Sequence, residues 1–257
     1  MNKAFKYAIT IVLALLAATC FVLFEAIHIE ILPNDTAANK MTCSLIYHLV
    51  VAVFLFWLIY LVGNVPYLSF KTTNLRTVLW CLPCLFVALA NIPYDGLING
   101  TITITRMDLM FLYILYVISI AVIEEIVFRG ILLYLCLDYL RNAKLKCFLS
   151  ALITTTIFAL FHFTNLFVGM DIASVLLQVL YTFLIGGMLA VIMFKTNNIW
   201  ICIFIHALFN FGGLINEIAD GSPWDSKLFW ILTIVCGILC AGHIIISLIN
   251  LEKKHAS

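Results

Sequence analysis

Eight apolar stretches, most of them about as long as a membrane-spanning helix, dominate the sequence. They cover residues 5–31, 45–63, 77–92, 108–139, 145–167, 172–194, 199–216 and 227–251. A helix needs about 20 predominantly apolar residues to cross the hydrocarbon core of a bilayer. The stretches therefore predict an all-α polytopic membrane protein with about eight transmembrane helices. Their connections are short and contain no long linker, so we expect residues 1–257 to form a single transmembrane domain.

Composition supports a bilayer as the surroundings of this chain. Hydrophobic residues make up 65% of it and charged residues 11%, whereas soluble proteins contain about 45 to 50% and about 25%. The formal net charge of +1 provides no basic field for nucleic acid, so we exclude that class of partner. The nine cysteines lie almost entirely within apolar stretches, where we interpret them as small apolar residues.

The distribution of lysine and arginine predicts the orientation in the cell membrane. If the N-terminus is cytoplasmic, the segments on its side of the membrane contain Lys3, Lys6, Lys71, Arg76, Arg141, Lys144, Lys146, Lys195, Lys253 and Lys254. The segments on the other side contain only Lys40, Arg106 and Lys227. Cytoplasmic segments carry an excess of basic residues. Both termini are therefore expected to be cytoplasmic.

Three charged residues interrupt the apolar stretch 108–139, namely Glu124, Glu125 and Arg129. A charge at the centre of a membrane helix costs roughly 2.5 to 3.5 kcal/mol on insertion scales, so it is rare unless it faces a partner or a wet cavity. Further polar groups at membrane depth are His162 in residues 145–167 and His206 and Asn210 in residues 199–216. Such groups turn inward and pair with one another, which suggests one shared site.

Helical spacing separates the roles of the two glutamates. Glu125 and Arg129 are four residues apart, the favourable order for an ion pair on one helix face. Glu124 points about 100° away from Glu125, so it is free for other partners. We therefore expect Glu124 to be the chemical carboxylate and Glu125 with Arg129 to support the site. Gly130 leaves room for close contact with a neighbouring helix.

This combination of side chains is typical of a hydrolase that acts on an amide bond. A glutamate and a histidine can hold and deprotonate a water molecule when burial raises the carboxyl pKa. A second histidine and an asparagine amide can donate hydrogen bonds to an oxyanion, and His206 and Asn210 share a helix face. Two alternatives use the same groups: interhelical contacts worth about 0.6 kcal/mol each, or a proton path. The chain lacks the matching halves with broken helices that transporters show.

Three motifs resemble those of the CAAX protease and bacteriocin-processing (CPBP) family of intramembrane endopeptidases. They are Glu124-Glu125-x-x-x-Arg129-Gly130, Phe158-x-x-x-His162 and His206-x-x-x-Asn210, within a core of about residues 108–216. The resemblance implies an endopeptidase that uses an activated water without a covalent intermediate. By motif, Glu124 and His162 would activate the water, and His206 and Asn210 would stabilise the oxyanion.

The family contains prenyl-protein endopeptidases, bacterial regulators of peptide signals and bacteriocin immunity proteins. The small size and short loops of this chain are more similar to the bacterial immunity and peptide-processing members. We therefore expect bacteriocin self-immunity or peptide processing, with a peptide or protein substrate in or at the membrane. One alternative is a non-catalytic immunity or scaffold protein that binds a bacteriocin or its receptor. Another is a CAAX prenyl endopeptidase.

A metal ion is the alternative to direct activation of water by a glutamate. Glu124, His162 and His206 form a possible zinc set of two histidines and one carboxylate, but the sequence has no His-Glu-x-x-His motif. The resemblance favours a metal-independent site without a cofactor. Residue counting places Glu124 and His206 near mid-membrane and His162 in the outer half, so a tilt or kink must bring them level.

Overall fold

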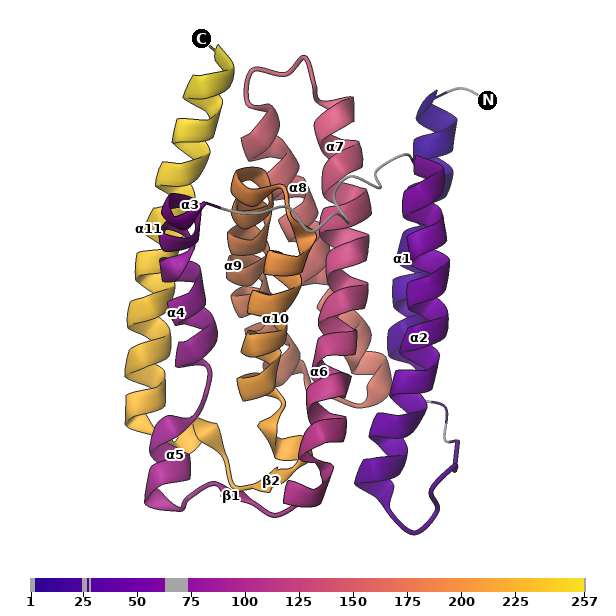
Figure 1. Cartoon of the computed structure of the whole chain (residues 1–257), viewed down its shortest axis with the longest axis vertical. Helices are drawn as coiled ribbons and strands as arrows, with labels where there is room; N and C mark the ends of the chain where they lie inside the picture. Colours follow the sequence, from indigo (N-terminus) through magenta and orange to yellow (C-terminus); the bar gives the residue numbers. More distant parts are fainter. Residues whose placement is uncertain (1–2, 25–26, 28, 63–73, 257) are drawn as a thin grey trace.

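The computed structural model describes the chain except for residues 1–2, 25–26, 28, 63–73 and 257. Its helices stand side by side in a bundle (Figure 1). Six helices in the described residues are long and apolar enough to cross a membrane. They are α1 (Lys3–Phe24), α2 (Thr36–Val62), the run Met107–Tyr139, the run Lys146–Val168, α9 (Ile172–Thr196) and α11 (Lys227–Ala256). The predicted class, an all-α multi-pass membrane protein, is confirmed.

The two remaining expected spans are shorter elements. Residues 77–92 fall on α3 (Leu75–Trp80) and α4 (Leu82–Ala90), with Pro83 in the first turn of α4. Proline lacks an amide hydrogen and disfavours continuation of the preceding helix, so the chain changes element at Cys81. α10 (Ile199–Gly213) has 15 residues, which at a rise of 1.5 Å per residue gives a length of about 22 Å. The expected count of about eight spans thus becomes six long helices, the short α10 and the divided α3 and α4.

A continuous helical rod through the bundle carries the charged residues. It consists of η2 (Met107–Leu109), α6 (Met110–Glu125), the π-helical η3 (Ile126–Leu133) and α7 (Tyr134–Tyr139). The hydrogen-bonding pattern changes from α to π directly after Glu125. π-helical turns occur frequently at functional sites, and this one was not predicted from the sequence.

Other helices pack closely around this rod. α6 lies between α2 and α10, while α8 (Lys146–Phe161) packs along α9. A Cβ atom added to Gly130 would lie 3.0 Å from the Ile59 side chain on α2 and 3.3 Å from that of Ile199 on α10. The close helix contact expected at this glycine is therefore present. The side chains of Ile126, Phe128 and neighbouring residues fill the core here.

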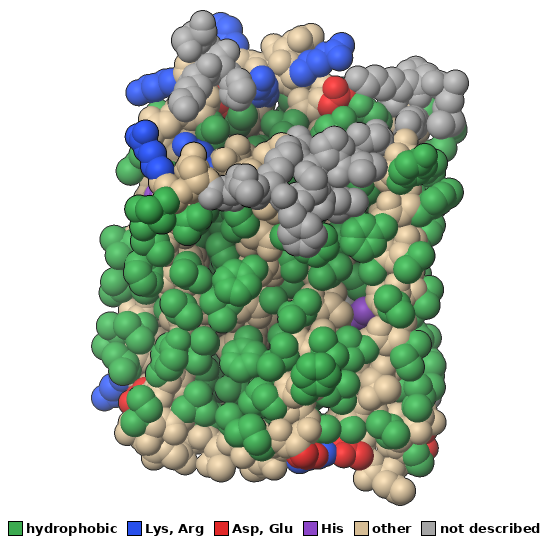
Figure 2. Space-filling view, in the orientation of Figure 1, with side chains coloured by type: hydrophobic (Ala, Val, Ile, Leu, Met, Phe, Trp, Pro, Cys, Tyr) green, Lys and Arg blue, Asp and Glu red, His purple; other side chains and the backbone are tan. Residues whose placement is uncertain are grey.

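The two ends of the bundle differ in structure and charge. The end with both termini, here the terminal end, also contains the α7–α8 and α9–α10 connections (Figure 1). The opposite end, here the β end, contains α5 (Tyr94–Asn99) and the antiparallel pair β1 (Thr103–Ile104) and β2 (Ala219–Asp220). It also contains the short helices η4 (His162–Val168), η5 (Ile215–Glu217) and η6 (Pro223–Asp225). On the face in Figure 2, lysine and arginine gather mainly at the terminal end and acidic residues mainly at the β end.

Some of the basic residues used in the orientation argument lie outside the described part. This applies to the whole of Lys71 and to the side chains of Lys3, Lys6 and Lys254. The cytoplasmic position of the termini stays a prediction.

Candidate active site

A buried ion pair joins Glu125 and Arg129, as their spacing predicted. Arg129 Nη1 donates to Glu125 Oε1 at 2.8 Å, and the two side chains are 3% and 0% exposed. Arg129 Nη2 donates to the Gly186 carbonyl on α9 at 3.2 Å, and the guanidinium carbon lies 4.6 Å from the centre of the Phe158 ring on α8. Arg129 therefore connects the central rod to two neighbouring helices while its charge stays compensated.

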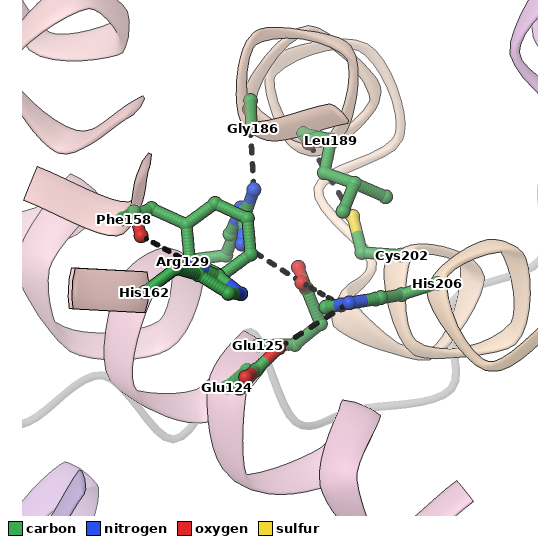
Figure 3. A network of polar contacts seen from close by, with 9 residues as sticks. All are labelled: Glu124, Glu125, Arg129, Phe158, His162, Gly186, Leu189, Cys202 and His206. Atoms are coloured by element: carbon green, nitrogen blue, oxygen red, sulfur yellow. Dashed lines mark hydrogen bonds and ion pairs between the residues drawn. The ribbon is translucent and has the colours of Figure 1, made fainter. Parts of the chain in front are cut away.

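His206 lies between the two glutamates (Figure 3). Its Nδ1 is 2.7 Å from Glu125 Oε1, and its Nε2 is 3.3 Å from Glu124 Oε2. A carboxylate can only accept, so Nδ1 is the donor and Nε2 is left to face Glu124. Helical spacing had assigned Glu125 to Arg129 alone. That prediction was incomplete, because spacing within one helix gives no information about the contact that His206 on α10 makes with Glu125.

His162 occupies the point where α8 changes into the 3-10 helix η4. Its Nδ1 is 2.9 Å from the Phe158 carbonyl oxygen, which can only accept, so the ring donates through Nδ1 and Nε2 remains available. The rings of His162 and His206 both meet the Phe158 ring edge-on, with centroid distances of 5.0 and 5.9 Å. Two histidines from different helices thus surround one aromatic ring, and the change of helix type at His162 accompanies this arrangement.

A cavity of about 1070 Å³ contains the four residues that the sequence nominated for catalysis. Glu124, His162, His206 and Asn210 all line it. Its wall also includes aromatic rings and side-chain amides, among them Tyr116, Phe161, Tyr181, Phe209, Asn91 and Gln178. Ligand sites combine such apolar walls with a few placed polar groups. Glu125 and Arg129 are absent from the lining, which separates them from the four.

The Gly186 carbonyl is a part of the site that the sequence reasoning missed. A Cβ atom on Gly186 would lie 3.0 Å from the Thr155 side chain and 3.1 Å from that of Phe158. This close approach of α9 to α8 brings the carbonyl within reach of Arg129. The adjacent pair Gly186 and Gly187 in an apolar span was the available signal, because small residues let membrane helices approach closely.

The alternative zinc set is not assembled as a metal site. Within the part of the chain that the structure describes, no three His, Cys, Asp or Glu side chains are grouped so that they could hold a metal ion. Glu124, His162 and His206 therefore share a cavity without forming a ligand cage.

Residues 106–212 match a family model described as "Type II CAAX prenyl endopeptidase Rce1-like". No curated protein and no solved structure matches the chain. The matched segment contains the central rod, both histidines, Asn210 and the α9 glycine that meets Arg129. Together with the buried glutamate and histidine cluster, the match identifies residues 106–212 as an Rce1-like domain of the CPBP family of intramembrane proteases.

Proposed function

We propose that this chain hydrolyses peptide bonds at the Glu124 end of the cavity. The observation that carries the proposal is the cluster of Glu124, Glu125 and His206, which is buried among apolar helices. Two of its members, Glu124 and His206, border a cavity large enough for a peptide segment. A glutamate beside a histidine can activate water. Ionisable groups buried in a membrane cost free energy, so they are rare and usually mark a functional site.

In the proposed reaction, one water molecule is held by the Glu124 carboxylate and by Nε2 of His162. The water oxygen attacks the carbonyl carbon of the peptide bond while one of its protons passes to Glu124. Asn210 and Nε2 of His206 donate hydrogen bonds to the resulting oxyanion, which requires that His206 carry a proton on each ring nitrogen because Nδ1 already donates to Glu125. The carbon–nitrogen bond then breaks, and the nitrogen takes the proton from Glu124 and leaves as an amine. The second product is a carboxylic acid, which ionises.

Glu125 and Arg129 are positioning residues in this scheme. Glu125 holds Nδ1 of His206, which keeps the opposite edge of that ring beside Glu124. Arg129 in turn fixes the carboxylate of Glu125. Neither residue borders the cavity, so neither needs to contact the substrate.

We propose bacteriocin self-immunity or the processing of a secreted peptide as the biological role, since the loops between the helices are short. A prenylated C-terminal peptide is the second candidate substrate. The description of the matching family model favours it, and the aromatic wall of the cavity could accept a prenyl chain.

The test uses detergent-solubilised protein and a library of quenched-fluorescent peptides, with a farnesylated C-terminal peptide included. Glu124→Gln, His162→Ala, His206→Ala and Asn210→Ala should each abolish or strongly reduce cleavage. Glu252→Gln serves as the matched control, because Glu252 lies on α11 and contacts the backbone of Phe148, away from the cavity. Full activity in folded Glu124→Gln would refute the mechanism. Cleavage of the farnesylated peptide alone would favour the second candidate.

A further inference from the structure

We propose that the substrate reaches Glu124 from the extracytoplasmic side of the membrane and is an exported peptide rich in basic and apolar residues. This inference rests on the proposed peptide hydrolysis. It excludes the cytoplasmic C-terminus of a prenylated protein as the natural substrate. Three features support it: the direction in which the cavity opens, the barrier on its other side and the charges of the two ends.

The large cavity runs from the glutamate and histidine cluster to the β end. Its inner part is bordered by Glu124, Phe158 and His206. Its outer part is lined by residues of the segments that make up the β end, including Thr36 and Asn39 at the start of α2, Asn165 in η4, Leu214 after α10 and Trp224 in η6. The opening therefore lies at the β end.

A barrier separates this cavity from the terminal end. A second cavity of about 290 Å³ is lined by Arg129, Leu133, Lys146 and Cys147 among others, on the terminal side of the cluster. Arg129 borders the smaller cavity, and Phe158 borders the larger one. Because the guanidinium lies over the Phe158 ring, their contact stands between the two spaces. The neighbouring η3 side chains are buried, which closes the same layer.

The charge distribution assigns the β end to the outside of the cell. The terminal end carries the described residues Arg76, Arg141, Lys144, Lys146, Lys195 and Lys253. The β end carries Lys40, Arg106 and Lys227. Since basic residues concentrate in cytoplasmic segments, the terminal end is cytoplasmic and the opening of the large cavity faces outward.

The field at the opening selects a basic peptide. Among the described residues of the β end, the acids are Glu30, Asp35, Asp95, Asp108, Asp171, Glu217, Asp220 and Asp225, and they outnumber the three described cations. Lys40 at the cavity wall is bound to Glu217 at 2.5 Å, and Arg106 is bound to Asp35 and Asp108. A surface of one charge sign concentrates ligands of the opposite sign. The aromatic wall behind this opening then accepts apolar side chains of the same peptide.

The first experiment measures orientation without any need for catalysis. Ser174 is exposed and lines the cavity, and Arg141 is exposed at the terminal end. Ser174→Cys and Arg141→Cys are each treated with a membrane-impermeant maleimide in spheroplasts and in inverted vesicles of a bacterial host. Site-specific mass spectrometry distinguishes the introduced cysteine from the nine native ones. Ser174→Cys should be labelled in spheroplasts and protected in inverted vesicles, and Arg141→Cys should show the reverse. The opposite pattern would overturn the inference and leave the proposed hydrolysis intact.

The second experiment measures cleavage from each side. A membrane-impermeant quenched peptide with lysine and aromatic residues is given to the two preparations, with Glu124→Gln as the background. We expect cleavage by spheroplasts and none by inverted vesicles. Cleavage by inverted vesicles alone would overturn the inference. If detergent-solubilised protein cleaves no peptide, the proposed hydrolysis fails, and with it the assignment of a substrate, whatever side the labelling gives for the opening.

A separate variant tests the preference for a basic peptide. Asp171 caps α9 by accepting from the Ser174 amide, and asparagine caps helices as well as aspartate does. Asp171→Asn therefore removes a charge at the opening without removing the cap. It should raise KM for the basic peptide and leave kcat unchanged. Wild-type protein should cleave a version with glutamate in place of lysine more slowly, and equal rates would refute the charge preference.

Discussion

Two pairs of an arginine with a carboxylate lie at different depths of this protein. Arg129 and Glu125 are 3% and 0% exposed and meet at 2.8 Å, while Arg106 and Asp35 at the β end are 33% and 34% exposed and meet at 2.5 Å. The contacts are similar in length, but their surroundings are not. Removing one partner of a buried pair leaves an uncompensated charge, whereas an exposed pair contributes little and is screened by salt. Contact distance alone therefore does not indicate how much an ion pair contributes to stability.

The buried pair also has a function that the exposed pair lacks. Glu125 accepts from His206 as well as from Arg129, so the pair orients a ring beside Glu124. Arg106 binds Asp35 and Asp108, which ties the segment before α2 to the start of the central rod. One pair organises the proposed chemistry, and the other connects surface segments near the cavity opening.

The largest expected effect is a loss of kcat on substitution of Glu124, the residue beside which the buried pair orients His206. Glu124→Gln removes the proposed base but keeps the shape of the side chain, so kcat should fall by roughly 10²- to 10⁴-fold, as for other lost general bases. Thermal unfolding in detergent should stay close to that of wild type, because Glu124 borders the cavity and is not part of the Arg129 pair. A large loss of folded protein would contradict the division between the two glutamates.

Much of the fold, and the different roles of Glu124 and Glu125, could be predicted from the sequence. Apolar length specified the class of fold, and the spacing of Glu125 and Arg129 predicted their ion pair, because both depend on contacts within one helix. The break between α3 and α4 was also predictable, because Pro83 disfavours continuation of the preceding helix. The contact of Glu125 with His206 was not, since it depends on how α10 packs against α6.

Two other features of the site have a physical reason for being unpredictable. The π-helical segment after Glu125 changes backbone hydrogen bonds and leaves no pattern in side-chain type. The Gly186 carbonyl is a backbone group, and every residue has one, so the amino-acid type does not predict that it accepts from Arg129. Both features are set by packing between helices that are distant in the sequence.

Arg129→Gln should produce the next largest effect, this time on stability. Breaking a buried pair by removing one partner costs about 3 to 5 kcal/mol, and Glu125 would lose the neutralising charge. The double variant Glu125→Gln with Arg129→Gln should recover part of this loss, because it leaves no unpaired charge. Chemical unfolding in detergent of wild type, the single variants Arg129→Gln and Glu125→Gln, and the double variant gives the coupling between the two residues. Additive losses would show that the pair is not a unit.

Arg106→Gln is the matched change at the β end, and its effect should be much smaller. Both pairs lose the same positive charge, but water can solvate Asp35 after the loss. The unfolding temperature should fall slightly at low salt, and the difference from wild type should shrink as salt is added. The Arg129→Gln difference should persist at high salt. Equal sensitivity of both variants to salt would remove the contrast between the two depths.

The smallest effect concerns pH at the exposed pair. The Arg106 guanidinium, together with the Ala38 amide, lowers the pKa of Asp35 to about 2, below the value of about 3.9 for an unperturbed aspartate. A lowered pKa in the folded protein means that the contribution is fully present above the unfolded value and is lost as the pH falls towards 2. Asp35→Asn removes the charge, and its amide oxygen can still accept from the Ala38 amide as Asp35 does. The difference in unfolding temperature between wild type and Asp35→Asn should stay constant from pH 7 to about 4 and vanish towards pH 2. A difference that already declines between pH 7 and 5 would mean that another group, and not Asp35, carries the pH dependence.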